Sequence, residues 1–108
     1  MNKQGFCRIS VQQAHKLMQK GAVVVDVRDP ASFQQGHMPG ALHLDSNSAA
    51  DFIRQADPDA ATIVVCYHGH ASQSAANYLH GQDFTCLYSM DGGFTHWQLL
   101  YPDQVEKS

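Results

Sequence analysis

The sequence contains few cysteines, few charged residues and no long hydrophobic run. Three cysteines are present among 108 residues. Because an odd number cannot pair completely, a disulfide framework like that of small secreted domains is excluded, and reduced thiols fit a cytoplasmic protein. No apolar run approaches the roughly 20 residues that a membrane span needs. The opening segment, MNKQGFCRIS, lacks the apolar stretch of a signal peptide. We therefore expect a cytoplasmic protein without a membrane partner.

The low charge also limits the possible partners. Charged residues make up 16% of the chain and the formal net charge is −3, while apolar residues make up 44%. This is enough apolar material for a core and too little charge for a disordered chain. The slight acidity gives no electrostatic reason to expect nucleic acid as a partner. The length predicts a single domain over residues 1–108, with its core between about residues 8 and 100.

Short apolar runs alternate with amphipathic stretches along the chain. The run over residues 22–27 is β-branched and nearly all apolar, as in a strand that is buried on both faces. The segment after Pro102 is expected to be loose. Because the connections are too long for hairpins, the pattern predicts an α/β fold with a mostly parallel sheet and helices on both faces. Strands are predicted at residues 8–10, 22–27, 41–44, 62–65 and 85–88.

Residues that favour helix starts mark three of the predicted helices. Ser10 and Gln13 have the spacing of a capping box. Asp29 precedes a proline, as an N-cap does when proline occupies the first helical position. Ser46 or Asn47 could cap a further helix that runs to about residue 54.

Cys66 is the residue whose place in this pattern most suggests chemistry. It ends the buried strand at 62–65 and begins a short loop, with Gly69 in it, that leads into a helix from about Ser72. In open α/β sheets, sites gather at the carboxyl ends of the strands. Backbone N–H groups and the helix dipole would there favour an anion and lower the pKa of the Cys66 thiol below about 8.5. Such a loop would also bind a small oxyanion or an anionic persulfide.

A second interpretation of these cysteines stays open. A cysteine at a strand end is often a small buried residue without a chemical role. We apply that interpretation to Cys7, near a terminus, and to Cys86, which has no glycine-bearing loop after it. From the residues alone, Cys66 is either a nucleophile in an anion cradle or another small buried residue.

Four short segments, taken in their order along the chain, form a recognisable set. They are Val25-Asp26-Val27-Arg28-Asp29, Gly36-His37-Met38-Pro39-Gly40-Ala41, the loop Cys66 to Ala71, and Asp91-Gly92-Gly93-Phe94 with Trp97. In this order they resemble the signatures of the rhodanese family of single-domain sulfurtransferases, over about residues 8 to 100. Within the family, the loop and the Tyr-Ser-x-Asp-Gly-Gly-Phe pattern from Tyr88 are most similar to the small bacterial thiosulfate sulfurtransferases associated with glycerol 3-phosphate metabolism.

The resemblance implies a five-stranded parallel sheet flanked by helices on both faces, and a double-displacement reaction that needs no cofactor. The thiolate of Cys66 would take the outer sulfur of thiosulfate, release sulfite and become a persulfide. Cyanide, a small thiol or a thioredoxin-like protein would then accept that sulfur. Such a protein is expected to be a monomer or a homodimer. The implied binding loop consists of Tyr67, His68, Gly69, His70 and Ala71, supported by Ser72, Asp26 and Arg28.

The chain departs from the family pattern in its charges. Many rhodaneses carry Arg or Lys within the loop or at its end, and this loop contains neither, which leaves the preference for a doubly charged donor open. Ser32 stands where an acidic residue often follows the Asp-x-Arg strand. His68 and His70 either supply partial positive charge near neutral pH or are exposed residues without a role. A metal site formed by both histidines and Cys66 is disfavoured, because no Cys-x-x-Cys accompanies them and the metal would consume the thiolate.

Other residues of the four segments have structural interpretations. Asp26 and Arg28 alternate across a strand end, where an ion pair that holds neighbouring loops is a simpler role than catalysis. His37 is predicted to tie down its own loop. Phe94 and Trp97, three residues apart on one helix face, are predicted to pack in the core.

Two other functions are compatible with a cysteine at this position. A cysteine phosphatase or arsenate reductase uses a similar loop, but needs an additional residue and usually an arginine at its far end to clamp a tetrahedral anion. Ser72 stands at that end here. A persulfide carrier that delivers sulfur to a protein partner needs the same Cys66, so the sequence does not separate it from an enzyme.

Overall fold

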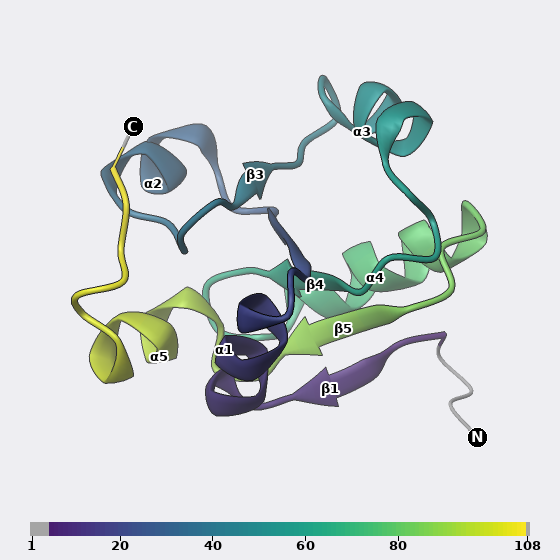
Figure 1. The fold of residues 1–108 in the computed structure, drawn as a ribbon. Helices are drawn as coiled ribbons and strands as arrows, with labels where there is room; N and C mark the ends of the chain where they lie inside the picture. Colours follow the sequence, from purple (N-terminus) through teal and green to yellow (C-terminus); the bar gives the residue numbers. More distant parts are fainter. Residues whose placement is uncertain (1–4, 108) are drawn as a thin grey trace.

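Strands and helices alternate throughout residues 5–107, which are the residues described by the computed structural model. All strand pairs are parallel, and their order across the sheet is β1-β5-β4-β2-β3 (Figure 1), so the predicted five-stranded α/β fold is confirmed. The strands are β1 (Cys7–Ile9), β2 (Val23–Asp26), β3 (Leu42–His43), β4 (Thr62–Val65) and β5 (Leu87–Met90). The helices are α1 (Val11–Gln19), α2 (Pro30–Gln35), α3 (Ala49–Gln55), α4 (Ala71–Gly81) and α5 (Gly93–Leu100).

The two faces of the sheet carry separate hydrophobic cores. Val24 of β2 lies beside Ile63 of β4, and both belong to the core that includes α1 and Trp97 of α5. The next pair, Val25 and Val64, belongs to the core formed with α3 and α4. Every residue of β4 is buried, as expected for a β-branched run covered by helices on both faces.

Two of the three predicted helix caps are present. The Ser10 hydroxyl accepts from the Gln13 N–H at 3.1 Å, and the Gln13 side chain accepts from the Ser10 N–H at 2.8 Å, which completes the capping box of α1. The Asp29 carboxylate accepts from the Ser32 N–H at 3.1 Å and so caps α2. Within residues 5–107, none of the helices is long and apolar enough to cross a membrane.

The third predicted cap is wrong. The sequence favours Ser46 or Asn47, whereas α3 begins at Ala49. The residue before the helix, Ser48, makes no side-chain cap bond. Its hydroxyl donates to the carbonyl of His43 at 3.0 Å, so it fastens the end of β3 instead.

The last strand begins two residues later than predicted. β5 covers Leu87–Met90 rather than residues 85–88. The Thr85 N–H donates to the carbonyl of Pro58 at 2.9 Å, and its hydroxyl donates to Asp59 at 2.8 Å. Thr85 is therefore held by the turn that precedes β4, and pairing with the sheet starts after it.

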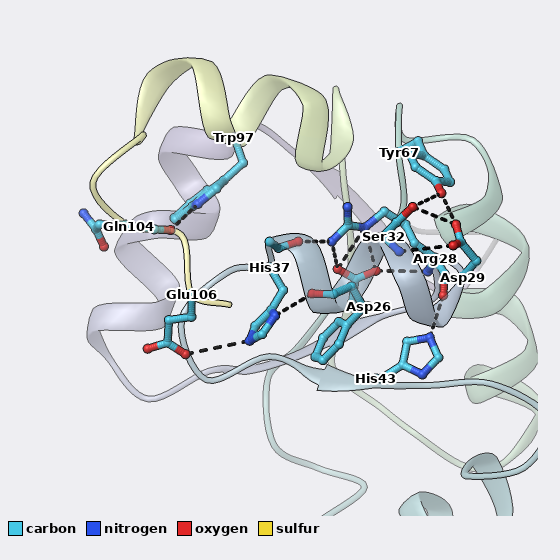
Figure 2. Close-up of polar contacts among 12 residues, drawn as sticks. Asp26, Arg28, Asp29, Ser32, His37, His43, Tyr67, Trp97, Gln104 and Glu106 are labelled. Carbon is cyan, nitrogen blue, oxygen red and sulfur yellow. Dashed lines mark hydrogen bonds and ion pairs between the residues drawn. The ribbon is translucent and has the colours of Figure 1, made fainter. Parts of the chain in front are cut away.

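The segment after Pro102, expected to be loose, is docked on the domain. The Trp97 indole N–H donates to the carbonyl of Gln104 at 2.9 Å. His37 and Glu106 exchange two backbone hydrogen bonds of 2.9 Å. Figure 1 shows this segment running from α5 to α2, and Figure 2 shows its contacts. The expectation is wrong because hydrogen bonds to residues distant in the sequence hold the segment, and such bonds leave no periodic pattern in its side chains.

We predict that Ser10→Ala lowers the free energy of unfolding by about 1 kcal/mol, because it removes the hydroxyl of the capping box. Urea denaturation followed by circular dichroism measures this change. Ser46→Ala is the matched control: it alters a serine that caps no helix and should stay within about 0.5 kcal/mol of the parent. Equal losses in both variants would contradict the role given to Ser10.

Candidate active site

Cys66 lies at the carboxyl end of β4, next to the centre of the sheet. Cys66 is buried, with only 3% of its surface exposed. Its neighbours on the loop, Tyr67, His68 and His70, are exposed. The loop is one residue shorter than expected, because Ala71 is already the first residue of α4. The thiol is thus enclosed by a tight turn that leads into a helix.

A backbone N–H and a chain of hydroxyls approach the sulfur of Cys66. The Gly69 N–H donates to Sγ at 3.1 Å. Ser72 Oγ lies 3.3 Å from Sγ and 2.8 Å from Ser89 Oγ on β5, so two buried hydroxyls form a chain that ends at the sulfur. Gly69 has a φ of +94°, and a Cβ there would lie 3.0 Å from the Gly92 nitrogen. The turn around the sulfur therefore requires glycine at position 69.

The environment of Cys66 changes the acidity of its thiol. Burial raises the pKa, but hydrogen bonds from the Ser72 hydroxyl and from the backbone N–H groups of Ser72, Gly69 and His68 lower it by more. The pKa of Cys66 therefore lies below its ordinary value, and a larger fraction is thiolate at neutral pH than in an exposed cysteine.

Helix α5 holds the outer side of the loop through its first backbone groups. The Phe94 N–H donates to the carbonyl of Cys66 at 2.8 Å, and the Thr95 N–H donates to the carbonyl of Tyr67 at 3.1 Å. Gly93 precedes them with a φ of +60°, and a Cβ at this position would lie 2.4 Å from the Tyr67 carbonyl. The sequence identified Gly93 only as part of the segment Asp91-Gly92-Gly93-Phe94, and did not predict its contact with the loop.

Asp26 and Arg28 form a buried ion pair beside the loop. Arg28 Nη2 lies 2.8 Å from Asp26 Oδ2 and donates to the carbonyl of Gly36 at 2.6 Å. The guanidinium carbon also lies 4.2 Å from the centre of the Phe94 ring. Figure 2 shows this cluster between α2 and α5. The geometry agrees with the structural interpretation of the pair, which joins three segments around the site.

The Tyr67 side chain ties the loop to the start of α2. Its hydroxyl donates to the Asp29 carboxylate and lies 2.6 Å from Ser32 Oγ. These hydrogen bonds, first that from Tyr67 and then those from Ser32, lower the pKa of Asp29 to about 2. The sequence identified Asp29 as a helix cap and as the last residue of the segment Val25-Asp26-Val27-Arg28-Asp29. Its contact with the loop was missed, because the two residues are 38 positions apart and share no local pattern.

The histidines divide into buried and exposed ones. His37 is buried, and its Nδ1 lies 2.8 Å from the carbonyl of Phe33, while its ring stacks on Phe33 at 4.0 Å, consistent with a role in holding its loop. His68 and His70 are exposed on the loop of Cys66. No group of three or more His, Cys, Asp or Glu side chains is arranged to hold a metal ion within residues 5–107.

Comparison with known proteins places these features in one family. The rhodanese-like domain model matches residues 10–100. The chain belongs to the rhodanese family. It is 60% identical over 100 residues to the thiosulfate sulfurtransferase GlpE of Pseudomonas entomophila (strain L48), covering 93% of this chain and 92% of that protein. It is 61% identical over 101 residues to GlpE of Pseudomonas putida (strain F1), with coverages of 93% and 92%.

A solved structure shows the same fold at low sequence identity. The rhodanese-like domain protein from Staphylococcus aureus superposes with a TM-score of 0.80 and 18% identity, over 95% of this chain and 99% of that chain. The parallel sheet and its flanking helices are therefore those of a rhodanese.

We predict that Ser72→Ala raises the pKa of the Cys66 thiol in this rhodanese, because it removes a hydroxyl that stabilises the thiolate. Since the thiolate is the reactive form, the half-maximal rate of iodoacetamide alkylation at Cys66 should move about one pH unit higher. Peptide mass spectrometry over a pH series measures that rate. Ser74→Ala, on an exposed part of α4, should leave the pH profile unchanged. An unchanged pH profile in Ser72→Ala would show that the Ser72 hydroxyl does not lower the pKa of Cys66.

We predict that Gly93→Ala is far more destabilising than Gly21→Ala. Both glycines have positive φ, so each alanine costs about 1 kcal/mol in backbone strain. A Cβ at Gly21 meets nothing within 4 Å, whereas at Gly93 it meets the Tyr67 carbonyl at 2.4 Å. The contact should lower the free energy of unfolding by a further ~2 kcal/mol or more, as measured in urea. Similar losses of unfolding free energy in the two variants would mean that the backbone of Gly93 is not in close contact with the loop.

Proposed function

We propose that this rhodanese is a thiosulfate sulfurtransferase and that Cys66 is its nucleophile. The observation that supports this proposal most is the environment of the Cys66 thiol. Its buried sulfur accepts a hydrogen bond from the Gly69 N–H and lies beside the Ser72 hydroxyl, and the pKa of the thiol is lowered. Because the thiolate is the nucleophilic form of cysteine, a lowered pKa increases the fraction of Cys66 that can react. The relatives named thiosulfate sulfurtransferase cover almost the whole chain, which supports the same activity here.

In the first step, the Cys66 thiolate attacks the outer sulfur of thiosulfate. A new S–S bond forms on Cys66, the S–S bond of thiosulfate breaks, and its electron pair leaves with sulfite. The outer sulfur of the resulting persulfide carries the negative charge. In this proposal the N–H groups of the loop from Tyr67 to Ala71 hold this charge, which is the general principle of an oxyanion-binding site. The proposal is supported by the backbone N–H groups of His68 and Gly69, which already bond to Sγ.

In the second step, an acceptor attacks the outer sulfur of the persulfide and returns Cys66 to the thiolate. Cyanide would give thiocyanate, and a small thiol or a thioredoxin-like protein would give a persulfide of its own. Each step breaks one S–S bond and forms one new bond to the transferred sulfur, an S–S bond or, with cyanide, a C–S bond, so the reaction needs no cofactor. The covalent intermediate predicts ping-pong kinetics.

In this proposal, the positive potential that attracts thiosulfate comes from the backbone dipoles of the loop and not from charged side chains. Neither Arg nor Lys occurs between Cys66 and Ser72. The exposed rings of His68 and His70 lie on the same loop and can add charge when protonated. Phosphate-ester hydrolysis is disfavoured, because the turn from Cys66 to His70 lacks the arginine that clamps a tetrahedral anion.

We predict that Cys66→Ser abolishes thiocyanate formation from thiosulfate and cyanide, with a loss of about 1,000-fold or more, because the sulfur nucleophile is gone. Intact-mass spectrometry after thiosulfate treatment should show one added sulfur atom on the parent protein and none on the variant. Cys86→Ser, before β5 at the opposite end of the sheet, is the control and should keep both properties.

Two results would change the proposal. Undiminished turnover in Cys66→Ser would exclude Cys66 as the nucleophile. A normal mass gain combined with very slow turnover on cyanide and on small thiols would favour a persulfide carrier that serves a protein partner.

A further inference from the structure

Ser89 is a polar residue among the valines of the central strands. It lies on β5 opposite Val64 of β4, which in turn lies opposite Val25 of β2. Side chains of paired residues point to the same face of a sheet, so Ser89 faces the core formed with α3 and α4, to which both valines belong. Its surface is fully buried. A buried hydroxyl costs free energy unless it is hydrogen-bonded, so a serine at this position needs a partner.

The partner of Ser89 is the hydroxyl of Ser72. The two Oγ atoms lie 2.8 Å apart, and within residues 5–107 the Ser89 hydroxyl has no second hydrogen-bond partner. Ser72 is in the first turn of α4 and is also fully buried. Its Oγ lies 3.3 Å from the sulfur of Cys66. The two hydroxyls therefore form a chain between Ser89 and the sulfur, without contact with solvent.

The chain has a direction, because each hydroxyl supplies one hydrogen. If Ser72 donated to Ser89, the hydrogen of Ser89 would have no acceptor among the described residues. A buried donor without an acceptor is unfavourable, so the Ser89 hydroxyl donates to Ser72 Oγ. The hydrogen of Ser72 is then available to Sγ of Cys66, which is the second hydrogen-bond partner of its hydroxyl.

We propose that Ser89 is a positioning residue for the reaction of Cys66: by donating to Ser72 Oγ, it directs the Ser72 hydrogen to the sulfur and strengthens that hydrogen bond. The inference rests on the sulfurtransferase activity proposed above, to which it adds a residue. A hydroxyl that accepts one hydrogen bond becomes a stronger donor, because successive bonds polarise one another. Without Ser89, the Ser72 hydroxyl can turn to a backbone carbonyl of the preceding turn, as serine side chains in helices do.

The two hydroxyls act on the thiolate more than on the persulfide. In the thiolate, the negative charge is on Sγ, the atom that Ser72 contacts. In the persulfide, Sγ is bonded to a second sulfur and the charge is on that outer atom. Ser89 therefore stabilises the form of Cys66 that attacks in the first step and leaves in the second.

Apart from Cys66, no ionisable group takes part in this chain. The ionisable side chains on the elements around Cys66 are Asp26, Arg28, Tyr67, His68, His70, Asp91 and His96. Asp26 is paired with Arg28, and Asp91 is paired with Arg8. Within residues 5–107, none of these side chains forms a hydrogen bond with Cys66 Sγ, Ser72 Oγ or Ser89 Oγ. The effect of Ser89 therefore does not require any of them to change its charge.

A double-mutant cycle on the acidity of Cys66 tests the proposal. Ser89→Ala should move the half-maximal rate of iodoacetamide alkylation at Cys66 about 0.5 pH unit higher, because the bond from Ser72 to the thiolate is weakened. Since Ser89 acts only through Ser72, the same change in the Ser72→Ala background should cause no further shift. Peptide mass spectrometry over a pH series follows Cys66 separately from the other cysteines. The pH profile of kcat/KM for thiosulfate, which reports ionisations of the free enzyme, should shift equally in Ser89→Ala.

Two further variants separate positioning from stability. Ser89→Thr keeps a hydroxyl at the position and should restore the parent pH profile. Thr62→Val removes another buried hydroxyl, at the opposite end of β4, where it donates to the carbonyl of Ala60 at 3.1 Å, and should leave the profile unchanged.

Four results would overturn the role of Ser89. They are an unchanged profile in Ser89→Ala, the same shift in Thr62→Val, a failure of Ser89→Thr to restore the profile, and an undiminished shift in the Ser72→Ala background. Alkylation does not depend on thiosulfate. Failure of the underlying sulfurtransferase function is therefore seen separately, as the absence of added sulfur on Cys66 after thiosulfate treatment.

Discussion

The close approach of α5 to the loop of Cys66 is the contact on which the candidate site depends. Gly93 has no Cβ, and its place against the Tyr67 carbonyl leaves no room for one. The first N–H groups of α5 therefore bind the carbonyls of Cys66 and Tyr67. Because the C=O and N–H of a trans peptide point in opposite directions, the N–H of His68 is turned to the side of Sγ. One helix end thus orients the donors that lower the pKa of Cys66.

The Asp26–Arg28 ion pair helps to hold α5 against the loop of Cys66. A buried ion pair costs desolvation energy, so its value to stability is small unless it makes further contacts. Arg28 makes several: it binds the carbonyl of Gly36 at 2.6 Å and lies over the ring of Phe94, the residue after Gly93. The pair consequently fixes the position of α5 relative to β2 and α2. Loss of one partner would leave a buried charge, which costs about 3–5 kcal/mol and would also release the loop.

Local sequence patterns were sufficient to predict what depends on neighbours in the chain. The alternation of apolar runs predicted the α/β fold, and the place of Cys66 between a buried strand and a helix predicted its backbone donors. Contacts between distant segments were not predictable in this way. The bond from Tyr67 to Asp29 spans 38 positions. Residues 101–107 are held by hydrogen bonds to His37 and Gly40, which lie more than 60 positions away, as well as to Trp97. The start of β5 was misplaced for the same reason, since Thr85 is held by a turn far away in the sequence.

The absence of Arg and Lys from the loop has a mechanistic consequence. In the proposed reaction the negative charge stays near one point, first on the Cys66 thiolate, then on the persulfide and then on the thiolate again. Fixed N–H groups can hold each of these species without rearrangement. A cation at the same point would also hold the substrate anions in their ground states, and binding that is equal in the ground and transition states does not accelerate the reaction.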